Sequence, residues 1–272
     1  MNTVTSVDGT TIAYDTRGQG PTVIVVDGAL TVRGAKTQLA ELLAPGFTVI
    51  SYDRRGKGDS GDTRPYGVAR EVEDIEALID EAGGPASLFG HSSGGTLALE
   101  AAAQLGGKAG KPGKVGRLAI YEAPHTDDPA DRKPWAAYIA GLTEALADGR
   151  HGDAVALFMS FLGMPGEQVA GMRLAPFWQG LEAVAPTLAY DHTGVLGPDR
   201  AVPAARAAGV AIPALLMYGT ASFPFMRETA EKLSRAMPGG QLRALDGQTH
   251  DVDQAVIAPI LAGFFAPRSP SS

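Results

Sequence analysis

The stretch ASLFGHSSGG, from Ala86 to Gly95, decides how this 272-residue chain is interpreted. Its first four residues form a short apolar segment that predicts a strand, and the segment from Ser93 to Leu105 predicts a helix. Between them lies the pattern G-x-S-x-G, in which glycines permit a strained turn that lifts a serine above a sheet. A glycine-rich turn that needs only small residues is the alternative, but the strand-turn-helix context favours Ser92 as a nucleophile.

Strands and helices alternate on both sides of this stretch. Asp8-Gly9 is a turn pair that predicts a β-hairpin, and Thr22–Val26 is a β-branched run typical of a strand buried on both faces. The other predicted elements are hairpin strands 3–7 and 11–15, strands 47–52, 117–121, 214–218 and 241–245, and helices 35–43, from 68 onward, and 225–237. This alternation predicts a mostly parallel α/β sheet.

Two regions depart from the alternation. Residues 126–210 show helical pieces rich in aromatic residues and no convincing buried strand, so we interpret them as a helical cap inserted between core segments 1–125 and 211–272. The glycine- and lysine-rich segment 106–116 predicts a mobile surface loop, with contact to an anionic ligand as the alternative. The polar tail from Pro267 to Ser272 is expected to fray.

Composition excludes several classes of protein. With 44% hydrophobic and 19% charged residues the chain is expected to be a soluble globular protein, and its net charge of -7 offers no basic stripe for nucleic acid. The absence of cysteine excludes disulfides and thiolate chemistry and fits a reducing compartment. We find no secretion signal, no membrane-spanning run and no metal or nucleotide motif. We therefore expect a cytoplasmic protein that needs no cofactor. The sequence does not decide whether the protein is a monomer or a homodimer.

A serine hydroxyl is a poor nucleophile unless a base, usually histidine, lies beside it. His250 follows the last predicted strand, and loops beyond the carboxyl ends of parallel strands gather site residues. His91 is the variable residue of the elbow, whereas His151 and His192 lie in the predicted cap, where satisfied polar positions are the simpler interpretation. His250 is therefore the predicted base, with a structural histidine as the alternative.

The chain resembles the α/β-hydrolase superfamily over nearly its whole length. The resemblance rests on Asp27-Gly28, the segment Tyr52–Ser60, the elbow at Ser92, and Gly247–His250. It implies an α/β-hydrolase fold, with a mostly parallel eight-stranded sheet flanked by helices and covered by a cap. Members hydrolyse esters, lactones, amides, epoxides or carbon–carbon bonds without a cofactor. Epoxide and haloalkane hydrolases are disfavoured, because they carry an aspartate where this chain has Ser92.

The acid of the triad departs from the usual family pattern. Most members have a G-x-x-D stretch after the seventh strand, which aligns with Gly219–Ser222, and a serine has no charge to stabilise an imidazolium. Glu122 follows the sixth strand and shortly precedes a proline, as in the zearalenone-type lactonases, which this chain resembles. The resemblance implies that Glu122 is the third member of the triad. The alternative is a helix-capping or salt-bridged surface glutamate.

An oxyanion hole is expected beside Ser92. The resemblance implies the backbone N–H of Ser93, the residue after the nucleophile, together with an N–H of Gly28 or Ala29 in the loop after the third strand. The sequence does not decide between these last two residues.

Asp27 stands where the family usually has a histidine. A buried negative charge would oppose a developing oxyanion, so we expect Asp27 to be turned away or neutralised by Arg54 or Arg55. In the cap, most aromatic residues are expected to form the cap's own core, but Trp178 and Phe158 are predicted to contact a substrate. This composition favours an uncharged, fairly hydrophobic small molecule.

Three functions remain open at this stage. The first is a serine hydrolase that cleaves an ester or lactone, with Ser92 as nucleophile, His250 as base and Glu122 as orienting acid. The second transfers the acyl group to an amine or alcohol, or uses the pocket for lyase or carbon–carbon cleavage chemistry. The third is a catalytically degenerate member of the superfamily that only binds small molecules. This hypothesis is motivated by the serine at position 222, where most members have an aspartate.

Overall fold

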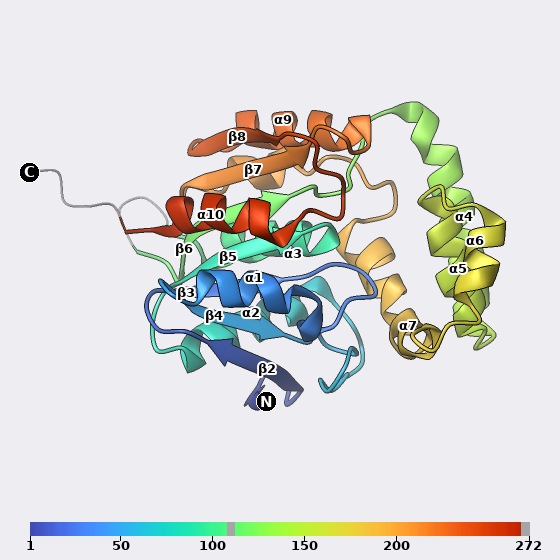
Figure 1. The fold of residues 1–272 in the computed structure, drawn as a ribbon, viewed down its shortest axis with the longest axis horizontal. Coiled ribbons are helices and arrows are strands. Elements are labelled where there is room, and N and C mark those ends of the chain that lie inside the picture. The colour runs from blue at the N-terminus through green and yellow to red at the C-terminus, as the bar shows by residue number, and fades with distance from the viewer. Residues whose placement is uncertain (108–111, 268–272) are drawn as a thin grey trace, which may run out of the picture.

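The computed structural model describes residues 1–107 and 112–267, which contain one eight-stranded sheet (Figure 1). The strands are β1 (Asn2–Thr5), β2 (Thr11–Arg17), β3 (Thr22–Val26), β4 (Thr48–Tyr52), β5 (Ala86–His91), β6 (Val115–Tyr121), β7 (Ala214–Gly219) and β8 (Gly240–Leu245). Their order is β1-β2-β4-β3-β5-β6-β7-β8. Strand β2 pairs antiparallel with β1 and β4, and the other pairs are parallel. The predicted mostly parallel α/β sheet is confirmed.

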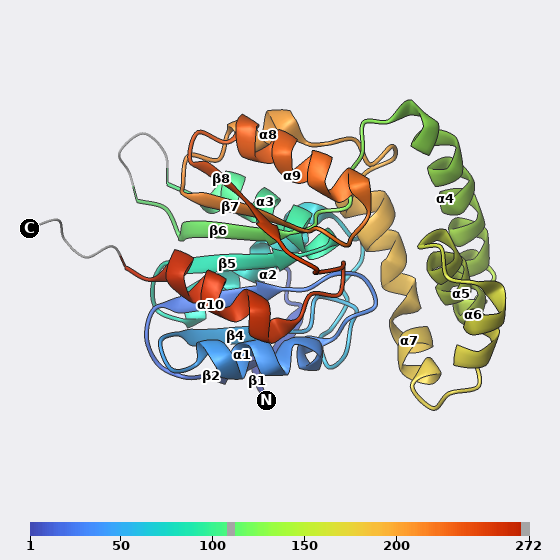
Figure 2. The ribbon, with the colours of Figure 1, turned by 45° about the horizontal axis from the view of Figure 1, so that its top comes forward.

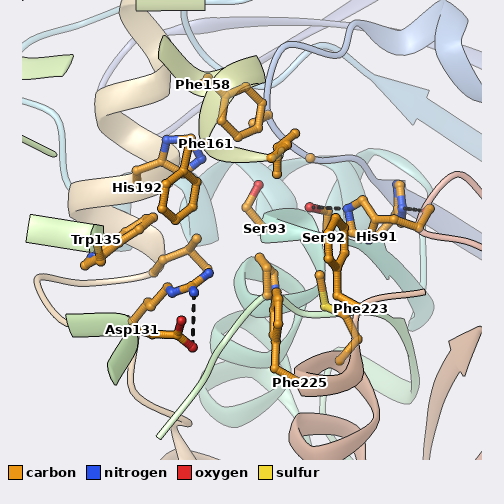
Figure 3. Close-up of a pocket in the computed structure, with 18 of the residues that line it drawn as sticks. His91, Ser92, Ser93, Asp131, Trp135, Phe158, Phe161, His192, Phe223 and Phe225 are labelled. Atoms are coloured by element: carbon orange, nitrogen blue, oxygen red, sulfur yellow. Dashed lines mark hydrogen bonds and ion pairs between the residues drawn. The ribbon is translucent and has the colours of Figure 1, made fainter. Parts of the chain in front are cut away.

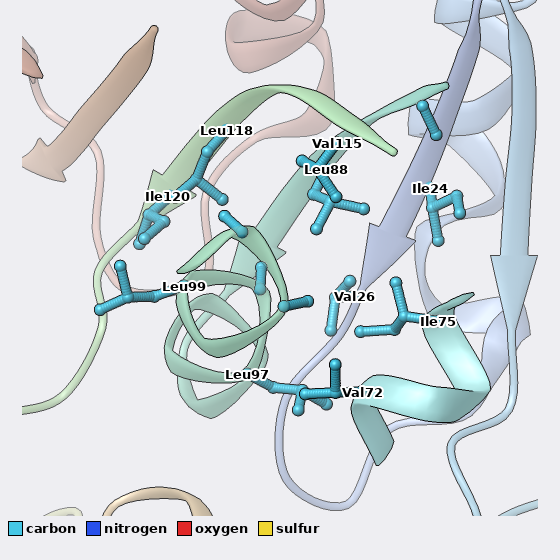
Figure 4. Close-up of a cluster of buried hydrophobic side chains, with 14 of the residues drawn as sticks. Ile24, Val26, Val72, Ile75, Leu88, Leu97, Leu99, Val115, Leu118 and Ile120 are labelled. Carbon is cyan, nitrogen blue, oxygen red and sulfur yellow. The ribbon is translucent and has the colours of Figure 1, made fainter. Parts of the chain in front are cut away.

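Helices cover both faces of the sheet, as β-branched strands buried on two sides require (Figures 1 and 2). One face carries α1 (Thr37–Leu43) and α10 (Gln254–Phe265), and the other carries α2 (Val68–Glu81), α3 (Ser93–Leu105), α8 (Ala204–Ala208) and α9 (Pro224–Ala236). Strand β3 shows the alternation: Ile24 and Val26 join the apolar cluster of α2 and α3 (Figure 4), while Val23 and Val25 join that of α1 and α10.

Helix α10 is an element that the sequence does not predict. Its apolar residues include Ile257, Leu261 and Phe265, which are buried against the sheet, but further apolar residues occupy its other sides. Pro259 lies inside the helix, although proline usually interrupts helices. An apolar segment with an internal proline has no clear 3.6-residue pattern, and this explains why the periodicity does not reveal the helix.

Between β6 and β7 the chain leaves the sheet and forms a separate helical layer, here called the cap (Figures 1 and 2). It comprises α4 (Arg132–Ala147), α5 (His151–Phe161), α6 (Gly166–Met172), α7 (Trp178–Val184) and a π-helical turn, Tyr190–Val195. The four α-helices share an apolar cluster that is separate from the two sheet clusters, whereas Val195 of the π-helical turn packs in the cluster of α2 and α3. No residue from 126 to 210, a range the structure describes in full, belongs to a strand. The domain limits 1–125, 126–210 and 211–272 stay predictions.

Two predicted segments extend beyond the described residues. In the predicted loop 106–116, Gly106 forms an isolated parallel bridge with Val115, while residues 108–111 lie outside the description. Of the tail, only Pro267 is described. Within the described ranges, no helix combines the length and apolarity that crossing a membrane requires.

Candidate active site

Ser92 occupies a sharp turn between β5 and α3 (Figure 3). Its φ of 57° and ψ of -131° are strained for a residue with a Cβ. The flanking glycines permit this turn because the backbone packs tightly on both sides. A Cβ on Gly94 would lie 2.2 Å from the Val26 carbonyl oxygen, and one on Gly90 would lie 2.5 Å from the Gly95 Cα. The turn therefore has the geometry of a nucleophile elbow.

The structure brings together the three residues of the predicted triad. His250 Nε2 lies 3.1 Å from Ser92 Oγ, and His250 Nδ1 lies 2.8 Å from Glu122 Oε2. A carboxylate accepts, so Nδ1 carries the proton and Nε2 presents a lone pair to the serine hydroxyl. This arrangement is the one in which an imidazole can accept a proton from serine.

Glu122 is held by two further hydrogen bonds. Its Oε1 accepts from the Gly219 N–H at 2.8 Å, and its Oε2 accepts from the Ser222 hydroxyl at 2.7 Å. The side chain has no exposed surface, and the backbone has a φ of 52°. Ser222 thus donates to the carboxylate instead of supplying one. The alternative that Glu122 is a surface glutamate is wrong, because the residue is buried between the ends of β6 and β7.

Two residues hold the backbone beside His250. His91 Nε2 lies 2.9 Å from the His250 carbonyl oxygen, and since a carbonyl only accepts, this nitrogen donates. The Tyr121 hydroxyl donates to the carbonyl oxygen of Thr249. In the sequence His91 is only the variable residue of the elbow, and nothing in its local pattern indicates this contact.

The expectation that Arg54 or Arg55 neutralises Asp27 is wrong. Each guanidinium is occupied by a buried carboxylate of α2: Arg54 pairs with Glu71, and Arg55 pairs with Asp74. Arg54 contacts only the backbone oxygen of Asp27, at 3.4 Å. The pattern of adjacent arginines does not show that α2 supplies their partners.

Asp27 is balanced by other groups. Its Oδ1 accepts the Gly28 N–H at 2.9 Å and faces His91 Nδ1 at 3.3 Å. Burial alone would raise the pKa of Asp27, but the contact with His91, the charge of Lys36 and the hydrogen bond from the Gly28 N–H lower it below its ordinary value. Because the Gly28 N–H is donated to this carboxylate, it is already engaged.

Two residues that line the cavity beside Ser92 have a backbone N–H without an acceptor in the described part of the chain. Ser93 is the first residue of α3, where an N–H has no partner within the helix, and Ala29 follows Gly28 in the loop after β3. Among the residues that the structure describes, neither N–H has an acceptor. Gly28 lets the loop approach closely, because a Cβ there would lie 2.9 Å from the Ser92 Cβ, and Lys57 Nζ donates to its carbonyl at 2.8 Å.

Ser92 and His250 open into a cavity of about 580 Å³ that the cap covers (Figure 3). Phe158 of α5, predicted from the sequence to contact a substrate, lies in its wall. The wall is mainly apolar, and the sequence pattern does not indicate several of its members: Trp135, Phe161, Leu196, Arg200, Phe223 and Phe225.

Trp178 does not line this cavity, so its prediction as a substrate contact is wrong. The side chain is buried in the cap cluster, and its indole N–H donates to Glu182 at 2.7 Å. Trp178 and Phe158 are both aromatic residues of cap helices, and the sequence does not show which side of each helix faces the sheet.

A carboxylate of the π-helical turn reaches the core next to the elbow. Asp191 pairs with Arg54, lies 3.1 Å from Lys57 Nζ, and accepts from the Ser93 hydroxyl at 2.7 Å. Burial alone would raise the pKa of Asp191, but Arg54 and Lys57 hold it well below its ordinary value. The cap is thus joined to the core by buried charges.

An elbow serine, a histidine after β8 and a carboxylate that supports it are the arrangement of the α/β hydrolases. The sequence model of the family described as "Alpha/beta hydrolase family" matches residues 28–258. Because this match spans most of the chain, the protein belongs to the alpha/beta hydrolase family, and the predicted superfamily is confirmed. The narrower resemblance to zearalenone-type lactonases stays a prediction.

Three known proteins are similar to this chain to different extents. An alpha/beta hydrolase from Sphaerobacter thermophilus DSM 20745 has a TM-score of 0.84 and 48% identity, over 97% of this chain and 100% of that chain. The enol-lactonase from Burkholderia xenovorans LB400 has a TM-score of 0.68 and 20% identity, over 96% and 98% of the two chains, and shows the fold alone. The uncharacterized hydrolase YraK of Bacillus subtilis (strain 168) is 33% identical over 103 residues, which cover 36% of this chain and 38% of YraK.

Proposed function

We propose that this protein is a serine hydrolase that cleaves a carboxylic ester or lactone through an acyl-enzyme on Ser92. The observation that carries the proposal is the continuous chain of contacts from Glu122 to His250, at 2.8 Å, and from His250 to Ser92, at 3.1 Å. These are the contacts by which a serine is activated in a triad. The similarity to the alpha/beta hydrolase from Sphaerobacter thermophilus supports a hydrolase, and the enol-lactonase from Burkholderia xenovorans has the same fold.

In the first step, His250 Nε2 accepts the Ser92 proton while Oγ attacks the carbonyl carbon. A carbon–oxygen bond forms, and the carbonyl electron pair moves onto oxygen, where the N–H groups of Ser93 and Ala29 stabilise the negative charge. We assign Ala29 rather than Gly28, because the Gly28 N–H is donated to Asp27. Collapse of the intermediate expels the alcohol oxygen, which takes the proton from His250.

In the second step, water restores the enzyme. His250 accepts a proton from the water as its oxygen attacks the acyl carbon, and the intermediate releases the acid from Ser92, which regains its proton from His250. With a lactone, the alcohol freed in the first step stays attached to the acyl chain, and both parts leave together. Glu122 keeps His250 in the required tautomer and stabilises its positive charge in both steps.

The walls of the cavity support an apolar substrate. Phe158, Phe161 and Leu196 line it, and ligand sites of this kind use apolar walls for affinity and a few polar groups for orientation. A small, mainly hydrophobic ester or lactone fits this description.

Reaction with a fluorophosphonate tests the assembled triad. The purified protein and its Ser92→Ala variant are incubated with the reagent at neutral pH, and intact mass is followed over time. We expect a rapid single adduct on the parent protein alone. A folded parent protein that gains no adduct would refute the proposal and favour a binding protein, while product analysis with an added alcohol or amine separates hydrolysis from acyl transfer.

A further inference from the structure

The cavity holds a buried cation whose hydrogen-bonding capacity is unused. Arg200 lines the cavity and is 6% exposed. Its guanidinium makes no hydrogen bond to any residue that the structure describes, and its Nε is fully enclosed without a partner. A guanidinium has five N–H donors, and burying even the one at Nε without an acceptor is unfavourable. Among the described residues, no acceptor therefore lies within hydrogen-bond distance of the Arg200 guanidinium.

Asp131 compensates this charge only in part. Its Oδ2 lies 3.6 Å from Arg200 Nη2, beyond hydrogen-bond distance, and its side chain is 37% exposed (Figure 3). Burial lowers the pKa of Arg200, and Asp131 is the group that opposes this effect. The pair is thus loose and half open to solvent, in contrast to the tight pairs of Arg54 and Arg55.

Three aromatic rings fix the position of the Arg200 guanidinium. Its Cζ lies 5.3 Å from the ring centre of Trp135, 5.4 Å from that of Phe161 and 5.0 Å from that of Phe225. Aromatic rings attract a cation but offer no lone pair in the plane of the guanidinium. The rings therefore orient the group and leave its N–H edges free.

The backbone at Arg200 is strained. Its φ is 43°, and its carbonyl oxygen accepts from the Thr126 N–H at 3.0 Å and lies 3.1 Å from His125 Nδ1. A non-glycine residue keeps such a conformation only where its surroundings enforce it, and such residues cluster at ligand sites. The strain indicates that the direction of this side chain is fixed by the fold.

We propose that Arg200 binds a carboxylate at the end of the substrate's acyl part, so that the protein acts on carboxylate-bearing esters or lactones and not on the uncharged molecules that the composition of the cap favours. This inference rests on the proposed function, because it needs Ser92 to hold the acyl group. Figure 3 shows Trp135 and Asp131 across the cavity from Ser92, so an apolar segment separates the reacting carbonyl from the carboxylate. A single negative charge fits better than a phosphate dianion, because Asp131 already lies beside the guanidinium.

Matched ester pairs test this assignment. The mono-4-nitrophenyl esters of adipic, pimelic and suberic acid are compared with 4-nitrophenyl hexanoate, heptanoate and octanoate, and Ser92→Ala supplies the background rate. We expect the carboxylate-ended ester of at least one pair to have a kcat/KM about 10- to 100-fold higher, the range for a hydrogen bond to a charged group. Hydrolysis of both series without this preference overturns the inference alone. No hydrolysis and no fluorophosphonate adduct overturn the proposed function and the inference with it.

Two variants connect the preference to Arg200. Arg200→Met keeps the length of the side chain and should reduce the ratio of kcat/KM values within the pair to about one, as the charge-assisted bond is lost. Labelling by the fluorophosphonate shows that its triad is assembled. Asp131→Asn removes the competing carboxylate and should increase the ratio about threefold or more, a test that holds even if Arg200→Met does not fold. An unchanged ratio in Asp131→Asn and in folded Arg200→Met refutes the assignment.

Discussion

The two walls of the cavity are built by different means. On the sheet side, backbone packing fixes Ser92: a Cβ on Gly94 would lie 2.2 Å from the Val26 carbonyl oxygen. On the cap side, side chains from separate helices pack on one another, with the rings of Trp135 and Phe161 5.5 Å apart. The reacting groups thus lie on the wall that tolerates the least change, while the cap wall can vary by side-chain substitution and so determine which substrate fits.

The largest effect is expected on the sheet side. Glu122→Gln removes the charge that stabilises the His250 imidazolium and should lower kcat by about 10³- to 10⁴-fold, as for the orienting acid of other triads. Steady-state kinetics measure the effect, and circular dichroism checks the fold. Activity equal to that of the parent protein would remove Glu122 from the mechanism.

A second substitution sharpens this test. Ser222 stands at the usual aspartate position and already contacts Glu122, at 2.7 Å. Adding Ser222→Asp to Glu122→Gln should recover about tenfold or more of the lost kcat, because the new carboxylate can reach the same imidazole. No recovery in a folded double variant would mean that the position after β7 cannot support His250 in this chain.

Removing the buried ion pairs that join the cap to the core should lower the stability of the fold. Asp191→Asn leaves Arg54 and Lys57 without their shared carboxylate and should lower the free energy of unfolding by about 3–5 kcal/mol. The folded-state pKa of Asp191 is depressed, so its stabilisation is present above the ordinary carboxyl pKa of about 3.9 and is lost as pH falls. Urea unfolding of both proteins between about pH 6 and about pH 3 should show a flatter pH dependence for the variant. Parallel curves would contradict this account.

Replacing Ser222 by alanine is expected to cause a smaller loss of activity than replacing Glu122. Ser222→Ala removes one of the donors that hold Glu122 Oε2, while the Gly219 N–H still holds Oε1. We expect kcat to fall about tenfold, because a hydrogen bond to a charged group contributes about 1.5 kcal/mol. Thr220→Ala, at a neighbouring exposed position, is the matched control. Equal kcat values for Ser222→Ala and its control would show that this hydroxyl does not matter.

The smallest effects separate the cavity wall from the core of the cap. Phe158→Leu removes apolar contact area and should raise KM for an apolar ester about fivefold, equivalent to about 1 kcal/mol. Trp178→Phe changes a residue that lies outside the cavity wall and should leave KM within about twofold of the parent value. KM values measured with the same ester decide the matter, and the opposite ranking would contradict the observed orientation of these helices.

The sequence predicts the parts of the molecule that backbone geometry dictates. The elbow is visible because only glycine fits at positions 90 and 94, and β3 is visible because a strand buried on both faces must be apolar at every position. Glu122 could be selected because the usual aspartate position holds a serine, which has no charge. Its contact with His250 depends on the adjacency of β6 and β7, which the family fold implies.

The sequence does not predict contacts made by long side chains between distant elements. The partners of Arg54 and Arg55 come from α2, and the hydrogen bond from His91 to the His250 carbonyl spans 159 positions. The sequence does not distinguish Arg200, because a lone arginine in an irregular segment resembles any surface residue. Helix α10 cannot be predicted from periodicity, because its apolar residues do not lie on a single face.

The hydrogen bond between Ser222 and Glu122 has a consequence for how such proteins diverge. The ends of β6 and β7 lie side by side, and Ser222, after β7, lies 2.7 Å from the carboxylate that contacts His250, so we expect that a carboxylate from either strand could support this histidine. A lineage that acquires the second acid before losing the first can pass from one arrangement to the other without an inactive intermediate. A sequence comparison that requires an acid after β7 would therefore classify this chain as inactive. Its proposed acid, Glu122, lies instead after the neighbouring strand β6.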